Sequence, residues 1–232
     1  LVVLTGLQSD SAYTAYVRAI CSEGDTSAIN TVSFRTASVG GDECIYTAES
    51  STTNGYNAPF SNFYKNSWTQ MIYPASLIGA SGDITSISFY CAAGGNLTQE
   101  SVKIYMANTD MPFATATTDW IAEENLELVC DLSNFAHPAD TGWITIPLDN
   151  AFSYEGGNLA VVVAVHATSY KSTIKYSYVA STSGSVLCRR SDSDTSCGDY
   201  PTEGGSKSTN LPIAQFCIQT GGCSSVSDIV VE

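Results

Sequence analysis

The chain has 232 residues, and 23 Asp and Glu residues against nine Lys and Arg residues give it a formal net charge of −14. This charge argues against binding to nucleic acid, which requires clustered cations, and against an anionic membrane surface. Hydrophobic residues make up 44 % of the chain, enough for a folded core. The longest aliphatic run, residues 159–165, is too short to span a bilayer, so no membrane insertion is expected.

Residues 1–36 are predicted to form a short β unit. Apolar and polar residues alternate over 13–19, and a second strand follows over 31–35 after a turn at 22–25. Thirty-six residues cannot bury an apolar face alone. The missing strands are therefore expected from sequence outside the chain, from the following domain or from a neighbouring molecule. The chain as a whole is expected to be a piece of a longer exported polypeptide.

This first segment carries the pattern VRAxC…G…S…VSFxT over residues 17–36. The pattern resembles the last three strands of a fibronectin type III domain, in the variety repeated in secreted and surface proteins of the Bacteroidetes. The resemblance implies that residues 1–36 are the C-terminal part of such a domain. It also implies that Cys21 pairs with a cysteine near the start of its own domain, and that Cys223 belongs to the next one; the two could also pair with each other if the chain ends touch.

A linker with paired glycines is predicted over 37–43, and the pattern after it is β throughout. The predicted strands are separated by glycine-rich turns, and no segment keeps a 3.6-residue apolar period. They cover residues 44–47, 67–73, 84–91, 101–106, 126–131, 142–147, 159–166, 174–178, 186–190 and 211–218. This spacing predicts an all-β fold, a jelly-roll-type antiparallel β-sandwich over 44–218. Residues 219–232 are predicted to be a linker and, over 226–231, the first strand of a possible next domain.

Four segments of the predicted sandwich, residues 66–73, 82–89, 102–106 and 142–159, are similar to the β modules found beside these fibronectin repeats. They also resemble, more distantly, the cleaved-adhesin domains of secreted bacterial proteases, which are jelly rolls. The resemblance implies adhesion or surface display.

The eight cysteines include no CxxC pair, which favours disulfides formed in an oxidising compartment over a zinc site. Eight cysteines allow 105 pairings, so the connectivity is a hypothesis. Cys188 and Cys197 bracket one loop, and Cys44 and Cys217 stand at the two ends of the sandwich, where terminal strands often lie together. Cys91 and Cys130 are the third predicted pair.

The sequence suggests two kinds of binding site, one for calcium and one for sugars. Strand-connecting loops can supply the carboxylate oxygens that calcium requires, and the expected donors are Asp42, Glu43, Asp140 and Asp149; the alternative is a solvated acidic surface. Tyr56, Tyr64 and Trp68 lie among asparagines, a combination that suits stacking on sugar rings and hydrogen bonding to their hydroxyls. The alternative is that these rings belong to the core.

No catalytic residue is predicted, because the sequence has only two histidines and no nucleophile or phosphate-binding motif. The chain is expected to be a non-catalytic, secreted or cell-surface adhesion module whose partner is a protein or glycan of a host or neighbouring cell. One alternative is a structural spacer or a fibre subunit that self-associates head to tail, with the strand over 226–231 adding to residues 1–36 of the next molecule. Another is the accessory carbohydrate-binding part of a secreted protease or glycosidase.

Overall fold

The computed structural model describes residues 12–22, 25–35, 42–193, 200–201 and 204–219. The chain divides into two compact units, and the larger spans Asp42–Gln219. Every strand pairing among the described residues is antiparallel. Within the described ranges, the helical elements are one four-residue helix, α1 (Ala75–Ile78), and one 3-10 turn at Glu123–Asn125. The predicted all-β sandwich is thus confirmed. No helix in these ranges is long and apolar enough to cross a membrane.

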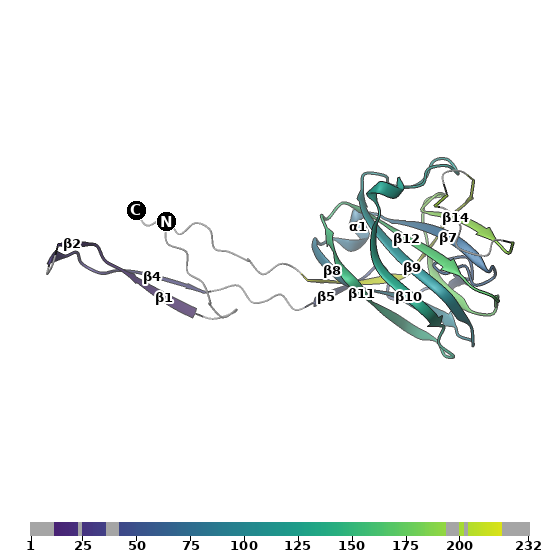
Figure 1. Ribbon diagram of the computed structural model, residues 1–232, viewed down its shortest axis with the longest axis horizontal. Coiled ribbons are helices and arrows are strands. Elements are labelled where there is room, and N and C mark those ends of the chain that lie inside the picture. The colour runs from purple at the N-terminus through teal and green to yellow at the C-terminus, as the bar shows by residue number, and fades with distance from the viewer. Residues whose placement is uncertain (1–11, 23–24, 36–41, 194–199, 202–203, 220–232) are drawn as a thin grey trace. The chain divides into compact units, whose positions relative to one another are not determined.

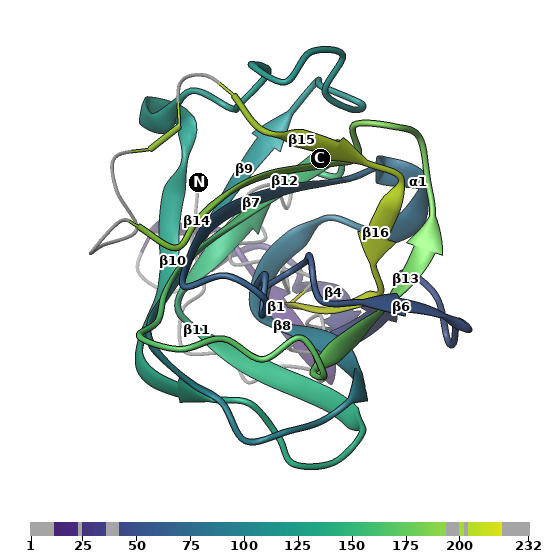
Figure 2. The ribbon, with the colours of Figure 1, turned by 90° about the vertical axis from the view of Figure 1, so that its right-hand side faces the viewer.

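Two sheets form the larger unit (Figure 1). The six-stranded sheet has the order β10 (Glu127–Ala136), β9 (Thr98–Thr109), β12 (Asn158–His166), β7 (Asn66–Tyr73), β14 (Val186–Ser191) and β15 (Ser206–Ser208). The seven-stranded sheet has the order β16 (Asn210–Pro212), β13 (Lys175–Ala180), β8 (Gly82–Ala93), β17 (Ala214–Gln219) and β5 (Asp42–Tyr46), with β11 (Gly142–Tyr154) beside β8 and β6 (Thr53–Gly55) beside β13. Most connections cross between the two sheets, as in a jelly roll. Figure 2 shows these layers from another side.

The core lies between the two sheets. Met71, Ile104 and Val161 of the six-stranded sheet pack in one cluster with Ile87 and Phe216 of the seven-stranded sheet, and all five are fully buried. Because strand side chains alternate between faces, β7 and β12 would expose every second residue if their outer side were open. The long β9–β10 connection covers that side, so all eight residues of β7 and residues 159–165 of β12 are buried.

The connection between β9 and β10 contributes two large side chains to this cover. Trp120 packs with Trp68, Val162 and Leu187, and Ile121 packs with Ile72 and Ala160 in a neighbouring cluster. Neither residue belongs to the strand predicted over 126–131, which corresponds to β10 and begins at Glu127. Their side chains are buried by the tertiary fold without belonging to either sheet.

The ten predicted strands of the sandwich are all present, with shifted or extended ends. Four elements were not predicted: the short strands β6 and β15, α1 and the 3-10 turn. The predicted strand over 211–218 is divided between β16 and β17, which pair with different strands on either side of Ile213. Short pairings of three residues depend on tertiary neighbours, so local sequence carries little signal for them.

The described part of the smaller unit is a hairpin. β1 (Ala12–Val17) pairs with β4 (Asn30–Arg35), and β2 (Ile20–Ser22) pairs with β3 (Asp25–Thr26). The hairpin leaves Tyr16 70 % and Ile20 71 % exposed, so its apolar side chains are not buried by its own residues. The structure does not test whether this unit is part of a fibronectin type III domain. The strand predicted over 226–231 lies outside the described residues.

Candidate functional site

One end of the sandwich gathers the connections β6–β7, β8–β9, β10–β11 and β12–β13. The chain enters the sandwich at Asp42 and leaves it at Gln219, and these two residues pair with each other. Gln219 pairs with Asp83 at the beginning of β8, whereas these connections lie near Ala93 at its end. The loops are therefore displayed at the end of the sandwich opposite to the one at which the chain enters and leaves.

Four aromatic side chains meet at this loop end, and we call Tyr56, Phe63, Tyr64 and Tyr170 the loop-end aromatic cluster. Phe63 is its centre, with ring centroids 5.2 Å from Tyr56, 5.5 Å from Tyr64 and 5.4 Å from Tyr170. Tyr170 is 50 % exposed and Phe63 36 % exposed. Exposed rings that hold one another in place form a surface on which the C–H face of a sugar can stack.

The loop that carries three of these rings is anchored in the core. Phe60 is fully buried, and the hydroxyl of Tyr178 accepts hydrogen bonds from the N–H groups of Asn57 and Ala58 and donates to the carbonyl of Ala58. Burial raises the pKa of Tyr178 to about 12, so this hydroxyl keeps its proton. The N–H of Lys171 also donates to the carbonyl of Asn62 at 2.6 Å, which joins the β12–β13 loop to the β6–β7 loop. The cluster is thus held in place before any ligand arrives.

Polar groups border the rings on the side of β14. The guanidinium of Arg190 lies 5.2 Å from the centroid of the Tyr64 ring, and its Nη1 donates to Oδ1 of Asn57 at 2.8 Å. Arg190 and Asn57 are both half-buried. A cation stacked on a ring, next to an amide, gives the loop end both apolar and hydrogen-bonding groups.

Two of the three predicted ligand-binding residues, Tyr56 and Tyr64, lie in this cluster. The third, Trp68, does not: it is only 8 % exposed and packs against Tyr105 and Tyr200, with ring centroids 5.9 Å and 5.1 Å away. Trp68 lies on β7 facing the cover of the six-stranded sheet, so its assignment as a ligand contact is wrong. Tyr170 and Arg190 were missed. A tyrosine in the polar segment Thr168-Ser169-Tyr170-Lys171 was a usable signal, since such turns rarely need an aromatic ring.

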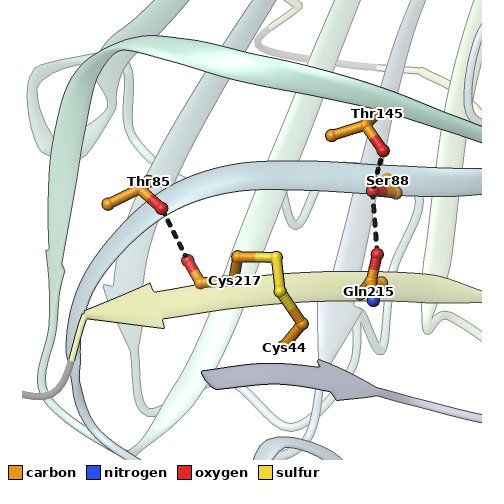
Figure 3. Close-up of a disulfide and its surroundings, with 6 residues drawn as sticks. All are labelled: Cys44, Thr85, Ser88, Thr145, Gln215 and Cys217. Atoms are coloured by element: carbon orange, nitrogen blue, oxygen red, sulfur yellow. Dashed lines mark hydrogen bonds between the residues drawn. A yellow bond between two sulfur atoms is a disulfide. The ribbon is translucent and has the colours of Figure 1, made fainter. Parts of the chain in front are cut away.

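A second aromatic group lies on the outer face of the seven-stranded sheet, and we call Tyr46, Tyr90 and Trp143 the sheet-face cluster. Trp143 is 5.1 Å from Tyr46 and 5.4 Å from Tyr90, both edge to face. A hydrogen-bonded row lies on the same sheet, in which the hydroxyl of Ser88 is 3.0 Å from Thr145 Oγ1 and 3.2 Å from Gln215 Oε1 (Figure 3). These polar groups are hydrogen-bonded to one another.

The predicted calcium donors are spread over the sandwich. Glu43 is exposed on β5, Asp140 is exposed in the β10–β11 connection, and Oδ2 of Asp149 on β11 accepts a hydrogen bond from the N–H of Asp131. The side chain of Asp42 is not among those described. Among the side chains that are, no three from His, Cys, Asp and Glu gather as a metal site requires. Calcium binding stays a prediction, which melting with and without calcium would test.

One predicted disulfide is present and one is corrected. Cys44 and Cys217 are bonded across the β5–β17 pair (Figure 3). Cys91 and Cys130 are separate buried thiols, so the predicted bridge between them is wrong. They lie on β8 and β10, which belong to different sheets, and Sγ of Cys130 faces the carbonyl of Pro147. The pairing of Cys188 with Cys197 stays a prediction, because Cys197 lies outside the described residues, as does Cys223.

The two histidines take structural positions. His137 is 5 % exposed, with Nδ1 2.8 Å from the hydroxyl of Tyr176, and burial lowers its pKa to about 4. Nδ1 of His166 lies 2.7 Å from Oδ1 of Asn66. The ring of His137 packs against both Phe60 and Phe135, with centroids 5.4 Å and 5.0 Å away, and these surroundings favour a role in packing.

No family model matches the chain, and no curated protein matches it. Among solved structures, it is similar to the cysteine protease and lectin-like domains of Cwp84, a surface layer associated protein of Clostridium difficile. The two share 11 % identity with a TM-score of 0.41, over 68 % of this chain. The chain spans 33 % of the length of that structure. A likeness of this size does not indicate what the chain binds.

Proposed function

We propose that the chain is a non-catalytic, extracellular carbohydrate-binding module and that the loop-end aromatic cluster is its binding surface. The observation that carries the proposal is the exposed group of rings around Phe63, bordered by Asn57 and Arg190. Aromatic faces supply the apolar contact to sugar rings, and amide and guanidinium groups supply hydrogen bonds to their oxygens. An extracellular location is supported by the disulfide between Cys44 and Cys217.

The position of the cluster also supports a binding role. The loops lie at the end of the sandwich opposite to the one at which the chain enters and leaves. A module attached at one end and carrying its binding surface at the other keeps that surface clear of its own linkers. The anchored loop reduces the entropy lost when a ligand binds.

A glycan array probed with the full chain tests this proposal, followed by affinity measurements on the glycans that bind. Phe63→Ala and Tyr170→Ala should each weaken binding about tenfold or more, because each removes a stacking surface. Tyr46→Ala is the matched control, since Tyr46 is also an exposed aromatic residue, 47 % exposed, but belongs to the sheet-face cluster. Its affinity should stay within about twofold of the parent chain.

Two results would contradict the proposal. Binding of no glycan by a folded chain would remove it. Loss of binding in Tyr46→Ala with none in Tyr170→Ala would instead place the surface on the seven-stranded sheet. Melting curves of all variants show whether a loss of binding reflects a loss of folding.

A second candidate function, self-association into a surface fibre, is favoured by the exposed apolar side chains of the hairpin. Tyr16 and Ile20 are 70 % and 71 % exposed. Exposed apolar groups of this kind mark contact surfaces. Light scattering at micromolar concentration should show oligomers that Ile20→Asp dissociates, and a monomer at every concentration would remove this candidate.

A further inference from the structure

The cations of this acidic chain include a group at the loop end. Of its nine Lys and Arg residues, Lys65 directly follows Tyr64, Lys171 directly follows Tyr170, and Arg190 lies over the Tyr64 ring. Positive charge next to an exposed aromatic surface suits a ligand that carries negative charge.

Arg190 is placed to receive an anion. Its hydrogen bond to Asn57 and its position over the Tyr64 ring restrict the movement of the guanidinium. A fixed guanidinium presents paired N–H donors whose geometry matches a carboxylate. Within the described residues the one ion pair joins Lys103 to Asp131, so no described carboxylate neutralises Arg190. Its half-buried position further strengthens attraction to an anion.

Two carboxylates at the loop end are held by other donors. Oδ1 of Asp192 accepts from the N–H of Lys65 at 3.0 Å. Glu100 accepts from the hydroxyl and the N–H of Thr168 at 2.6 Å and 2.8 Å, and these hydrogen bonds lower its pKa. Both carboxylates fix the loops, and among the described residues neither forms an ion pair with Arg190.

We infer that the saccharide bound here carries a carboxylate, as uronic and sialic acids do. The carboxylate would accept paired hydrogen bonds from Arg190, while the rings of Phe63 and Tyr170 contact the apolar face of the sugar. The inference rests on the proposed function, because it names the ligand class of the same surface. It adds that charge as well as stacking selects the ligand.

Matched ligand pairs test the inference with the full chain. The probes are polygalacturonate, alginate and sialylated glycans, each beside its neutral counterpart made by carboxyl reduction or removal of the sialic acid. Binding should be at least tenfold tighter to one or more acidic members than to their neutral counterparts. It should weaken as salt is raised from 50 mM to 500 mM. Equal or tighter binding to the neutral members would overturn the inference.

Arginine variants locate the effect. Arg190→Gln should lower affinity for the acidic member about tenfold more than it lowers affinity for the neutral member, because only the acidic member loses a charged partner of the guanidinium. Arg189→Gln is the matched control: Arg189 is adjacent and exposed, but it pairs in register with Trp68 and so faces the other side of the sheet. Arg190→Lys should bind the acidic member more tightly than Arg190→Gln does, because lysine restores the positive charge but not the paired N–H donors of the guanidinium.

The outcomes separate the two proposals. If neutral glycans bind through Phe63 and Tyr170 as tightly as acidic ones, the proposed function stands and the inference fails. If Arg190→Gln weakens acidic and neutral members equally without lowering the melting temperature, Arg190 only supports the loop and the inference is wrong. If no glycan binds, both proposals fail.

Discussion

Cys44 and Cys217 lie directly opposite each other on β5 and β17, and their sulfur atoms are bonded although 173 positions separate them in the sequence. The bond joins the first and last strands of the sandwich (Figure 3). It therefore closes nearly the whole module into one loop, next to the residues at which the chain enters and leaves. A force that pulls the chain apart at these two residues would therefore act on the disulfide before it acts on the hydrophobic core.

Removing the disulfide should destabilise the sandwich. The double substitution Cys44→Ser, Cys217→Ser should lower the free energy of unfolding by about 3 to 5 kcal/mol, because the unfolded chain regains the freedom of a very long loop. Urea unfolding measures the difference. Reductant should shift the parent chain towards the variant and leave the variant unchanged, and an equal response of both would contradict the assignment.

The thiols of Cys91 and Cys130 should be unreactive in the folded chain. Burial raises the pKa of Cys91, and burial together with the charge of Asp149 raises that of Cys130 to about 11. Thiolates are the reactive form, so alkylation at pH 8 should be slow before unfolding and rapid after it, without reductant. Mass spectrometry of unreduced peptides checks this. A peptide joined through Cys91 and Cys130 would contradict the separate thiols.

Acid should weaken the fold partly through His137. Its pKa is about 4 in the folded chain, below the ordinary value of 6.5, so the unfolded chain binds the extra proton first. Above pH 6.5 His137 is neutral in both states and the fold keeps its full stability. The contribution of this histidine to the free energy of unfolding is lost progressively as the pH falls from 6.5 to 4. The loss amounts to about 3 kcal/mol at most.

The measurement for His137 is the difference in stability between pH 7 and pH 4.5, in the parent chain and in His137→Gln. The variant should be less stable at pH 7, because its side chain packs less well against Phe60 and Phe135. Its stability should fall less on acidification than that of the parent chain. An identical fall in both proteins would show that other groups determine the acid sensitivity.

Gly184 should tolerate no side chain. Its φ is +99°, and a Cβ placed there would lie 1.9 Å from the carbonyl oxygen of Ala114, whose N–H donates to the carbonyl of Gly184 at 2.9 Å. Gly184→Ala should therefore destabilise the chain by about 3 kcal/mol and loosen the β9–β10 cover. Gly157→Ala is the control, because a Cβ there meets nothing within 4 Å. Similar melting temperatures for the two variants would contradict this packing.

The loop-end site shows how far the sequence reaches. Tyr56 and Tyr64 could be chosen from the sequence because they lie in a short run of aromatic and amide residues. Tyr170 and Arg190 lie more than 100 positions away, and only the fold brings them to the same surface. Trp68 belongs to the same run and still points elsewhere, because it lies on a strand whose side chains alternate between two faces that are both covered.

The sequence by itself determined the all-β fold, the positions of the ten main strands and the bond between Cys44 and Cys217. Alternating apolar residues and turn-forming glycines are local signals of strands and turns. Cys44 and Cys217 could be paired because they lie in the first and last predicted strands, which often lie together in a sandwich. The tertiary structure alone decided that Cys91 and Cys130 stay apart, that Trp68 is buried and that Arg190 lies over Tyr64. These depend on which strands become neighbours and on what covers the outer face of a sheet. Both are set by contacts between residues far apart in the chain, which a local pattern does not record.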